Sequence, residues 1–237
     1  MPSILHRTAC ALALAFTASA TLAGRPLATD DAATAPARSC QVESWADRGD
    51  VLQGTIVSGA CGVVDGFELG LELTRPQPRG EVRTGAGLAL KLAPQAWGAD
   101  TGAGAVRFGL KAAVASERTR VDGWSAHAPS LLGLVSFEPA DAWALHANLG
   151  LLRDGASRTS GGVVALAAVW TPVGRLLFFA EGQASNRREI FGPPVRSAGV
   201  RWWLVPERFG IDLVASRESG SAGTSSSIGF GWYGLGL

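Results

Sequence analysis

Beyond its N-terminal start, the 237-residue chain has no long hydrophobic run. The longest one, residues 163–170, falls far short of the ~18 to 20 apolar residues that a membrane-spanning helix needs. Charged residues are also scarce at 17%, whereas hydrophobic residues make up 47% and glycine occurs 31 times. This balance is unusual for a soluble enzyme. It leaves a soluble β fold or a membrane barrel, whose hydrophobic signal is spread over short alternating segments.

Histidine and cysteine are rare, with 3 of each, and one of each lies near the N-terminus. The two remaining thiols, Cys40 and Cys61, lack a nearby histidine and do not complete a tetrahedral metal site. His127 and His146 show no local signature of a nucleophile, a base and an orienting group. The sequence therefore predicts no catalytic residues, no metal and no cofactor.

The N-terminal residues have the features of a targeting segment. A short basic start precedes an apolar stretch at residues 9–16 and small residues suited to cleavage at 18–20 or 21–23. We therefore assign residues 1–23 to a cleaved signal peptide and exclude them from the fold. Loss of Arg7 lowers the 21 basic residues to 20, equal to the 20 acidic ones. A protein with no net charge is not expected to bind nucleic acid.

The next residues, 24–39, are small, polar and proline-containing, so we expect a flexible periplasmic lead-in. An export signal places Cys40 and Cys61 in an oxidising compartment, where two cysteines readily form a disulfide. If residues 41–60 form a hairpin that turns near 48–51, the two cysteines lie opposite each other at its open end. We therefore predict a Cys40–Cys61 disulfide.

Alternation of apolar and polar residues indicates β-strands along the remaining chain. The stretch 195–218 shows it best, because two alternating runs are joined at Pro206, where a missing N–H costs no ladder bond. The segments predicted as strands are 40–47, 52–61, 66–74, 81–93, 104–117, 129–138, 142–152, 161–171, 175–185, 195–205, 208–218 and 226–237.

We interpret residues 40–237 as one all-β domain, an antiparallel up-and-down transmembrane β-barrel of about 12 strands, with about 10 as the alternative. A soluble periplasmic β protein would alternate too, so the distinction depends on the connections. Every second connection is short, and the intervening ones are longer and more polar, as in membrane barrels with short periplasmic turns and longer outer loops. Residues 94–103 are long where a short turn is expected, and residues 118–128 are expected to form an outer loop.

Four tryptophans lie next to short turns, namely Trp143, Trp170, Trp202 and Trp203. Their position predicts an aromatic belt at one rim of the barrel, where an apolar ring with one polar N–H meets the membrane interface. Ordinary core positions would explain the same residues.

If the apolar face of each strand meets lipid, the opposite face lines the lumen and carries charges of both signs. These charges either satisfy one another as cross-strand pairs or form a constriction that selects solutes by charge and size. About twelve strands lie between filled barrels of about eight and open ones of roughly 16, so we expect a narrow or partly plugged pore. The lumen-facing candidates are Glu68, Glu72, Arg83, Lys91, Arg107, Lys111, His146, Asn148, Glu181, Arg201 and Asp212.

Four stretches carry a family resemblance: 40–45 (CQVESW), 143–150 (WALHANLG), 178–183 (FFAEGQ) and 199–213 (GVRWWLVPERFGIDL). They resemble outer-membrane proteins of the meta-pathway-of-phenol-degradation transporter family. The resemblance implies an outer-membrane β-barrel that passes small molecules, apolar ones among them, and it brings no catalytic residues.

We therefore expect a monomeric, porin-like barrel in contact with the lipid of a Gram-negative outer membrane, serving as a narrow channel or transporter for a small-molecule solute. One alternative is a structural or surface-interaction barrel that transports nothing. Another is a lipid-modifying outer-membrane enzyme, which would require His146 or His127 to meet a serine or an acidic partner in the fold.

Overall fold

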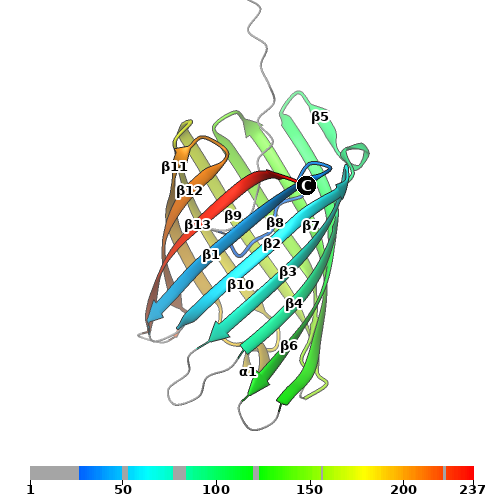
Figure 1. The fold of residues 1–237 in the computed structure, drawn as a ribbon, viewed down its shortest axis with the longest axis vertical. Helices are drawn as coiled ribbons and strands as arrows, with labels where there is room; N and C mark the ends of the chain where they lie inside the picture. The colour runs from blue at the N-terminus through cyan, green and yellow to red at the C-terminus, as the bar shows by residue number, and fades with distance from the viewer. Residues whose placement is uncertain (1–26, 50–52, 77–83, 120–122, 156, 221–222) are drawn as a thin grey trace, which may run out of the picture.

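The computed structural model describes residues 27–49, 53–76, 84–119, 123–155, 157–220 and 223–237. These residues form a closed antiparallel β-barrel (Figure 1). Strands that follow each other in sequence are hydrogen-bonded neighbours in an up-and-down order, and β1 pairs with β13. The sheet has 13 strands, of which the short β5 pairs only with β6, so 12 strands close the ring through the β4–β6 pair. The predicted barrel of about twelve strands is confirmed, and the alternative of ten is wrong.

The strands are β1 (Ser39–Gly49), β2 (Gly54–Val64), β3 (Phe67–Pro76), β4 (Thr84–Leu92), β5 (Ala99–Thr101), β6 (Gly104–Thr119), β7 (Gly123–Ala140), β8 (Trp143–Arg153), β9 (Ser160–Val173), β10 (Leu176–Ser185), β11 (Val195–Val205), β12 (Phe209–Glu218) and β13 (Thr224–Gly236). Two short helices, η1 (Gln95–Trp97) and α1 (Arg188–Phe191), lie in connections. The predicted signal peptide, residues 1–23, lies outside the described residues.

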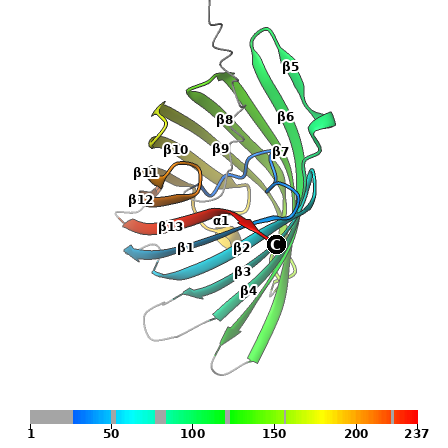
Figure 2. The same cartoon turned by 45° about the horizontal axis from the view of Figure 1, so that its top comes forward.

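Two connections differ from their predicted form. Residues 94–103, long where a short turn was expected, contain η1 and β5, and β5 folds back on β6 as a small hairpin at the rim (Figure 2). The predicted outer loop at 118–128 is mostly strand, because β6 continues to Thr119 and β7 begins at Gly123. Cross-strand hydrogen bonding thus continues β6 and β7 into residues whose polar sequence had suggested a loop.

The pleat separates an apolar exterior from a polar interior, because successive side chains of a strand point to opposite faces. On β8, Leu145, Leu149 and Leu151 are exposed on the outside, and Leu149 is 71% exposed. Their neighbours His146 and Asn148 point inward and are buried. In water, so many exposed leucines would be unfavourable, whereas on a membrane barrel they form the surface that contacts lipid.

Aromatic side chains gather on the outer surface near the short turns. The rings of Trp143 and Trp170 stack at 5.8 Å between centroids, Phe178 lies 5.7 Å from Trp170, and Trp202 is exposed. The prediction of a single outer cluster is wrong for Trp203, which points inward and is buried against Tyr233. It follows Trp202 directly in β11, so the two rings must lie on opposite faces.

The predicted Cys40–Cys61 disulfide is present and joins β1 to β2, where the two residues are register partners. It lies at the end of the barrel that carries the short turns, such as the one between β2 and β3, and this end is called the short-turn rim below. The last strand ends at the same rim, and the Leu237 N–H donates to the carbonyl of Arg38 over 3.1 Å. Figure 1 shows the C-terminus at this rim, on the same side as β5. Within the described part of the chain, no helix is long and apolar enough to cross a membrane.

Candidate functional site: a lumen occupied by residues 27–37

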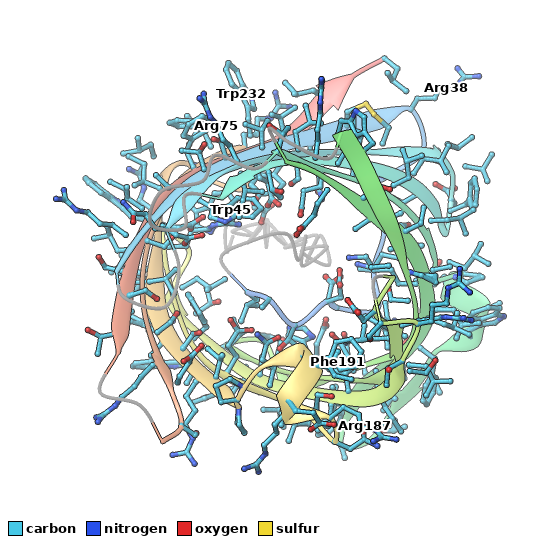
Figure 3. All side chains as sticks on the ribbon, turned by 90° about the horizontal axis from the view of Figure 1, so that it is seen from below. Arg38, Trp45, Arg75, Arg187, Phe191 and Trp232 are labelled. Atoms are coloured by element: carbon cyan, nitrogen blue, oxygen red, sulfur yellow. A yellow bond between two sulfur atoms is a disulfide. The ribbon has the colours of Figure 1, made fainter. Side chains whose placement is uncertain are left out.

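The chain that precedes β1 lies inside the barrel. Residues 27–37, called the luminal segment below, cross the interior of the ring, as the axial view shows (Figure 3). Leu27, Thr29, Asp31, Ala32 and Ala35 are buried there. This placement corrects the prediction of a flexible lead-in for the described part of residues 24–39, because these residues are bonded to the barrel wall rather than extending away from it.

The luminal segment has small side chains, and its backbone therefore comes close to the wall. Backbone N–H groups that leave water need a hydrogen-bond acceptor, and side chains of the wall supply it. Ala28 and Thr29 each donate to Glu181, at 2.8 and 2.9 Å. Further along, Ala32 donates to Ser136 Oγ at 2.8 Å and Ala35 to Glu68 at 2.7 Å. Acceptors from β3, β7 and β10 thus bind the segment along its length.

Asn148 of β8 binds both polar backbone groups of one residue. Its Oδ1 accepts the N–H of Asp30 at 2.8 Å, and its Nδ2 donates to the carbonyl of Asp30 at 2.7 Å. A primary amide matches a peptide group in this way because it carries a donor and an acceptor side by side. Asn148 therefore fixes the position of Asp30 on the wall.

The acidic pair of the segment neutralises two lysines. Lys91 on β4 and Lys111 on β6 are register partners, and both side chains enter the lumen. Asp31 pairs with Lys91 at 2.7 Å and Asp30 with Lys111 at 2.8 Å, while Asp30 also lies 3.7 Å from Lys91. Lys91 is only 4% exposed, so it needs a close anion to remain charged.

A second buried charge pair lies on the opposite side of the ring. Arg201 on β11 and Asp212 on β12 are register partners joined by two hydrogen bonds of 2.7 Å. The guanidinium also lies over the rings of Trp203 and Tyr233, at 4.9 and 5.1 Å from their centroids. The Tyr233 hydroxyl donates to Glu43 of β1. These contacts fill the lumen between β1 and β11 with a satisfied polar cluster.

His146 contacts a serine. Its Nδ1 lies 2.8 Å from Ser136 Oγ on the neighbouring strand, and the two residues are register partners. Ser136 Oγ also accepts the N–H of Ala32, so the luminal segment covers the serine, which is 3% exposed. A serine–histidine contact is one part of a nucleophilic site, but this one faces the lumen rather than the outer surface of the barrel.

The remaining predicted lumen residues lie in three places. Arg107 contacts Asp100 of β5 at the rim, with 2.6 Å between Nη2 and Oδ1. Glu72 of β3 borders a luminal cavity, and Arg83 falls outside the described residues. The other predicted members all enter the lumen, as described above.

The cavity beside the luminal segment has a volume of about 250 Å³. It lies between residues 27–30 and the wall formed by β1, β2, β3, β4 and β6. Both lysines line it together with Glu43, Glu68 and Glu72, and small residues such as Gly59, Ala60 and Ala89 line other parts of it. Space for a small polar molecule therefore remains next to the occupied part of the lumen.

Sequence reasoning missed several members of this site. Asp30 and Asp31 were assigned to a flexible lead-in, and Glu43, Ser136 and Tyr233 were not selected. The alternation of β13 could have indicated that Tyr233 points into the lumen, because Tyr233 lies on the strand face opposite the exposed Phe230 and Trp232. For the two aspartates, no local pattern distinguishes a segment that enters a lumen from one that does not.

The sequence matches one protein family over nearly its whole length, residues 11–230. The chain belongs to the family described as uncharacterised conserved protein UCP029691. The resemblance of this UCP029691 member to the meta-pathway transporters stays a prediction. Among curated proteins, none matches the sequence.

Similar solved structures share the barrel fold with this UCP029691 protein. A KdgM porin matches with a TM-score of 0.61 and 10% identity over 81% of this chain and 98% of that chain. A NanC porin matches with 0.58 and 7% identity over 81% and 98%. Outer membrane phospholipase A from Escherichia coli matches with 0.51 and 11% identity over 90% and 94%. These identities are too low to carry an activity, and the likeness shows the fold alone.

Proposed function

We propose that this protein is an outer-membrane channel for small polar solutes, narrowed at its short-turn end by the luminal segment. The observation that carries the proposal is the contrast between the two surfaces of the ring. The outer face exposes Leu71, Leu88 and Leu149, whereas the inner face carries Lys91, Lys111 and carboxylates around a cavity of about 250 Å³. A barrel with an apolar outside and a polar inside suits a passage for water-soluble molecules.

The short-turn rim, with the Cys40–Cys61 disulfide, faces the periplasm in this proposal, and the longer connections face outward. Membrane barrels have this arrangement of short periplasmic turns and longer outer loops. The predicted signal peptide would deliver the chain to the periplasm, where the disulfide can form. The luminal segment then enters the barrel from the periplasmic side.

The lining favours polar solutes over the apolar ones that the family resemblance implied. It also differs from what a long polyanion needs. A KdgM porin has been solved in complex with oligogalacturonate, a chain of carboxylated sugars. Here Lys91 and Lys111 form one short cluster flanked by Glu68 and Glu72. A short solute fits this lining better than a long polyanion does.

Planar-bilayer conductance of the refolded protein, together with liposome swelling in neutral sugars, tests the proposal. We expect discrete single-channel steps and faster swelling. Lys111→Glu should increase the preference for cations, because it adds negative charge to the lumen wall. Arg75→Glu is the matched control, since Arg75 is exposed on the face that β3 shares with Leu71 and Leu73. Protein that is folded but silent in both assays would favour a barrel that transports nothing.

The contact between Ser136 and His146 gives the enzyme alternative one specific observation to test. Catalysis by Ser136 would require the luminal segment to move away, because Ala32 donates to its Oγ. A serine-directed fluorophosphonate should therefore leave the folded protein unlabelled. Labelling that disappears in Ser136→Ala and in His146→Ala would instead establish a nucleophilic serine in the lumen.

A further inference from the structure

The luminal segment is bound in the way that a protein binds a peptide ligand. Backbone N–H groups of the segment donate to Glu181, Asn148, Ser136 and Glu68. Two adjacent carboxylates of the segment pair with two lysines. The segment places little apolar surface on the wall, since Leu27 is its one member of the hydrophobic cluster with Val169 and Phe179. Its position is therefore set by polar recognition.

The wall that binds the segment is preformed by the strands. Its polar side chains come from β3, β4, β6, β7, β8 and β10 and lie on rigid, hydrogen-bonded positions. Glu68, Lys91, Ser136 and Asn148 are all buried while the segment is in place. If the segment left, these groups would need water or another ligand, because buried polar groups without partners are costly.

We propose that this wall is a solute site for short peptides that carry two neighbouring carboxylates, and that the luminal segment is its built-in occupant. The inference rests on the proposed channel function. Asn148 selects a peptide group, because it binds both the N–H and the carbonyl of Asp30. The lysine pair selects the acidic side chains, and Glu181 accepts the N–H groups that precede them. A sugar acid would pair with the lysines, but it has no backbone N–H groups to donate to this series of acceptors.

Displacement of the segment is physically reasonable because its contacts with the wall are polar. A solute with equivalent groups restores the same hydrogen bonds and ion pairs, so the exchange leaves no buried group unpaired. The C-terminal end of the segment remains joined to β1 at the rim, next to the Cys40–Cys61 disulfide. The segment therefore acts as a competitive occupant of the channel.

The test uses two barrels and two peptides. One barrel is the full protein, and the other lacks residues 27–35, with its folding verified by heat-modifiable migration on a gel. The peptides are LATDDAATA, the sequence of residues 27–35, and LATNNAATA, in which both aspartates are replaced. Binding is measured by calorimetry in detergent and, separately, as block of single-channel current.

We expect the shortened barrel to bind LATDDAATA saturably and the full barrel to bind it at least about tenfold more weakly, since its own segment competes. LATNNAATA should bind the shortened barrel about tenfold or more weakly than the acidic peptide, because it lacks the charge-assisted bonds. In the shortened barrel, Lys91→Gln with Lys111→Gln should remove the difference between the peptides. Asn148→Ala should weaken both peptides equally, because it contacts only the backbone.

Equal binding of the two peptides, or no binding to the folded shortened barrel, would overturn the inference. If shortening the chain prevents folding, the full-length double variant Asp30→Asn with Asp31→Asn takes its place. It should bind LATDDAATA more tightly than the unaltered protein, because its own segment competes less well, and unchanged binding would overturn the inference too. Failure of the channel proposal is distinguishable, since calorimetry detects peptide binding even in a barrel that conducts no ions.

Discussion

Lys91 and Lys111 lie directly opposite each other on β4 and β6, and both point into the lumen. Like charges at opposed positions of neighbouring strands repel and destabilise the pair. The luminal segment offsets this repulsion, because Asp30 lies between the two ammonium groups and Asp31 pairs with Lys91. The segment and this part of the wall therefore depend on each other for stability.

Asp31→Asn should destabilise the folded barrel by about 3 kcal/mol, because it leaves the buried Lys91 with a weaker set of partners. Adding Lys91→Met to this variant should recover most of the loss, since no buried charge then remains at this position. Urea unfolding in detergent micelles measures both values. A double variant as unstable as the single one would show that the cost does not come from the unpaired lysine.

Acid should release the luminal segment. Burial opposes the ionisation of Asp30, but Lys111 and Lys91 outweigh it and hold the pKa of this carboxyl below its ordinary value. A carboxyl with a lowered pKa stabilises the bound segment fully above the ordinary aspartate value of about 3.9 and loses this contribution as the pH falls through its own lower pKa. Conductance should therefore rise in a step below pH about 4. The step should shrink in Asp30→Asn, whereas an unchanged step would assign it to another group.

Gly62 provides a steric test of the same contact. A Cβ at this position would overlap the carbonyl oxygens of Ala35 and Pro36, so Gly62→Ala should push the segment away from the rim and raise conductance. Gly59→Ala on the same strand is the control, because its Cβ would meet only the carbonyl of Gln41, at an ordinary 3.7 Å. Equal conductance of the two variants would contradict a tight fit at Gly62.

The pair of Arg201 and Asp212 should contribute far more to stability than a surface pair. Asp212→Asn is expected to cost about 3 to 5 kcal/mol, because it leaves a buried guanidinium without its carboxylate. Glu189→Gln breaks the exposed contact of Glu189 with Arg187, where the ionic atoms are 3.7 Å apart, and should change stability by less than about 1 kcal/mol. Similar losses in urea unfolding would show that the lumen around Arg201 is well hydrated.

The depth of outward-facing residues in the membrane can be tested by comparing one on β8 with one on β9. Leu149 lies in the middle of its strand and is 71% exposed, so Leu149→Arg should cost about 2 to 4 kcal/mol in a bilayer. Val173→Arg, at the last residue of β9, should cost about 1 kcal/mol or less, because it lies near the interface. Refolding into vesicles under urea titration gives both numbers. Equal costs would argue against a membrane midplane at the level of Leu149.

The strands were predictable because apolar and polar residues alternate with a period of two along each of them, which is a local property of the sequence. In β11 and β12, the same alternation places Arg201 and Asp212 on one face, and the short turn between them sets the register that pairs them. Trp203 shows that closeness to a turn does not predict the face on which a ring lies. Its place in the alternation of β11, and not its distance from Pro206, decides which way the ring points. The extended hairpin of β6 and β7 was underestimated, since its polar sequence resembles that of a loop.

The luminal segment was not predictable from local signals. Its small and polar residues are also typical of disordered chain, because neither kind of segment buries much apolar surface. What orders it is a set of acceptors and lysines on six strands that meet only after the barrel closes. Asp30 and Asp31 become interpretable once Lys91 and Lys111 are known to be neighbours, which is a property of the register between β4 and β6.

The main-chain link to β1, which the disulfide joins to β2 at the rim, makes displacement of the segment a tethered reaction. With Cys40 fixed to Cys61, a released segment of residues 27–39 reaches no further than roughly 45 Å from the rim. It therefore experiences the lumen at an effective concentration on the order of millimolar, whatever the amount of protein present. A free solute must exceed that internal concentration, or bind better, to occupy the site, and this sets a threshold below which the barrel would remain occupied by its own chain.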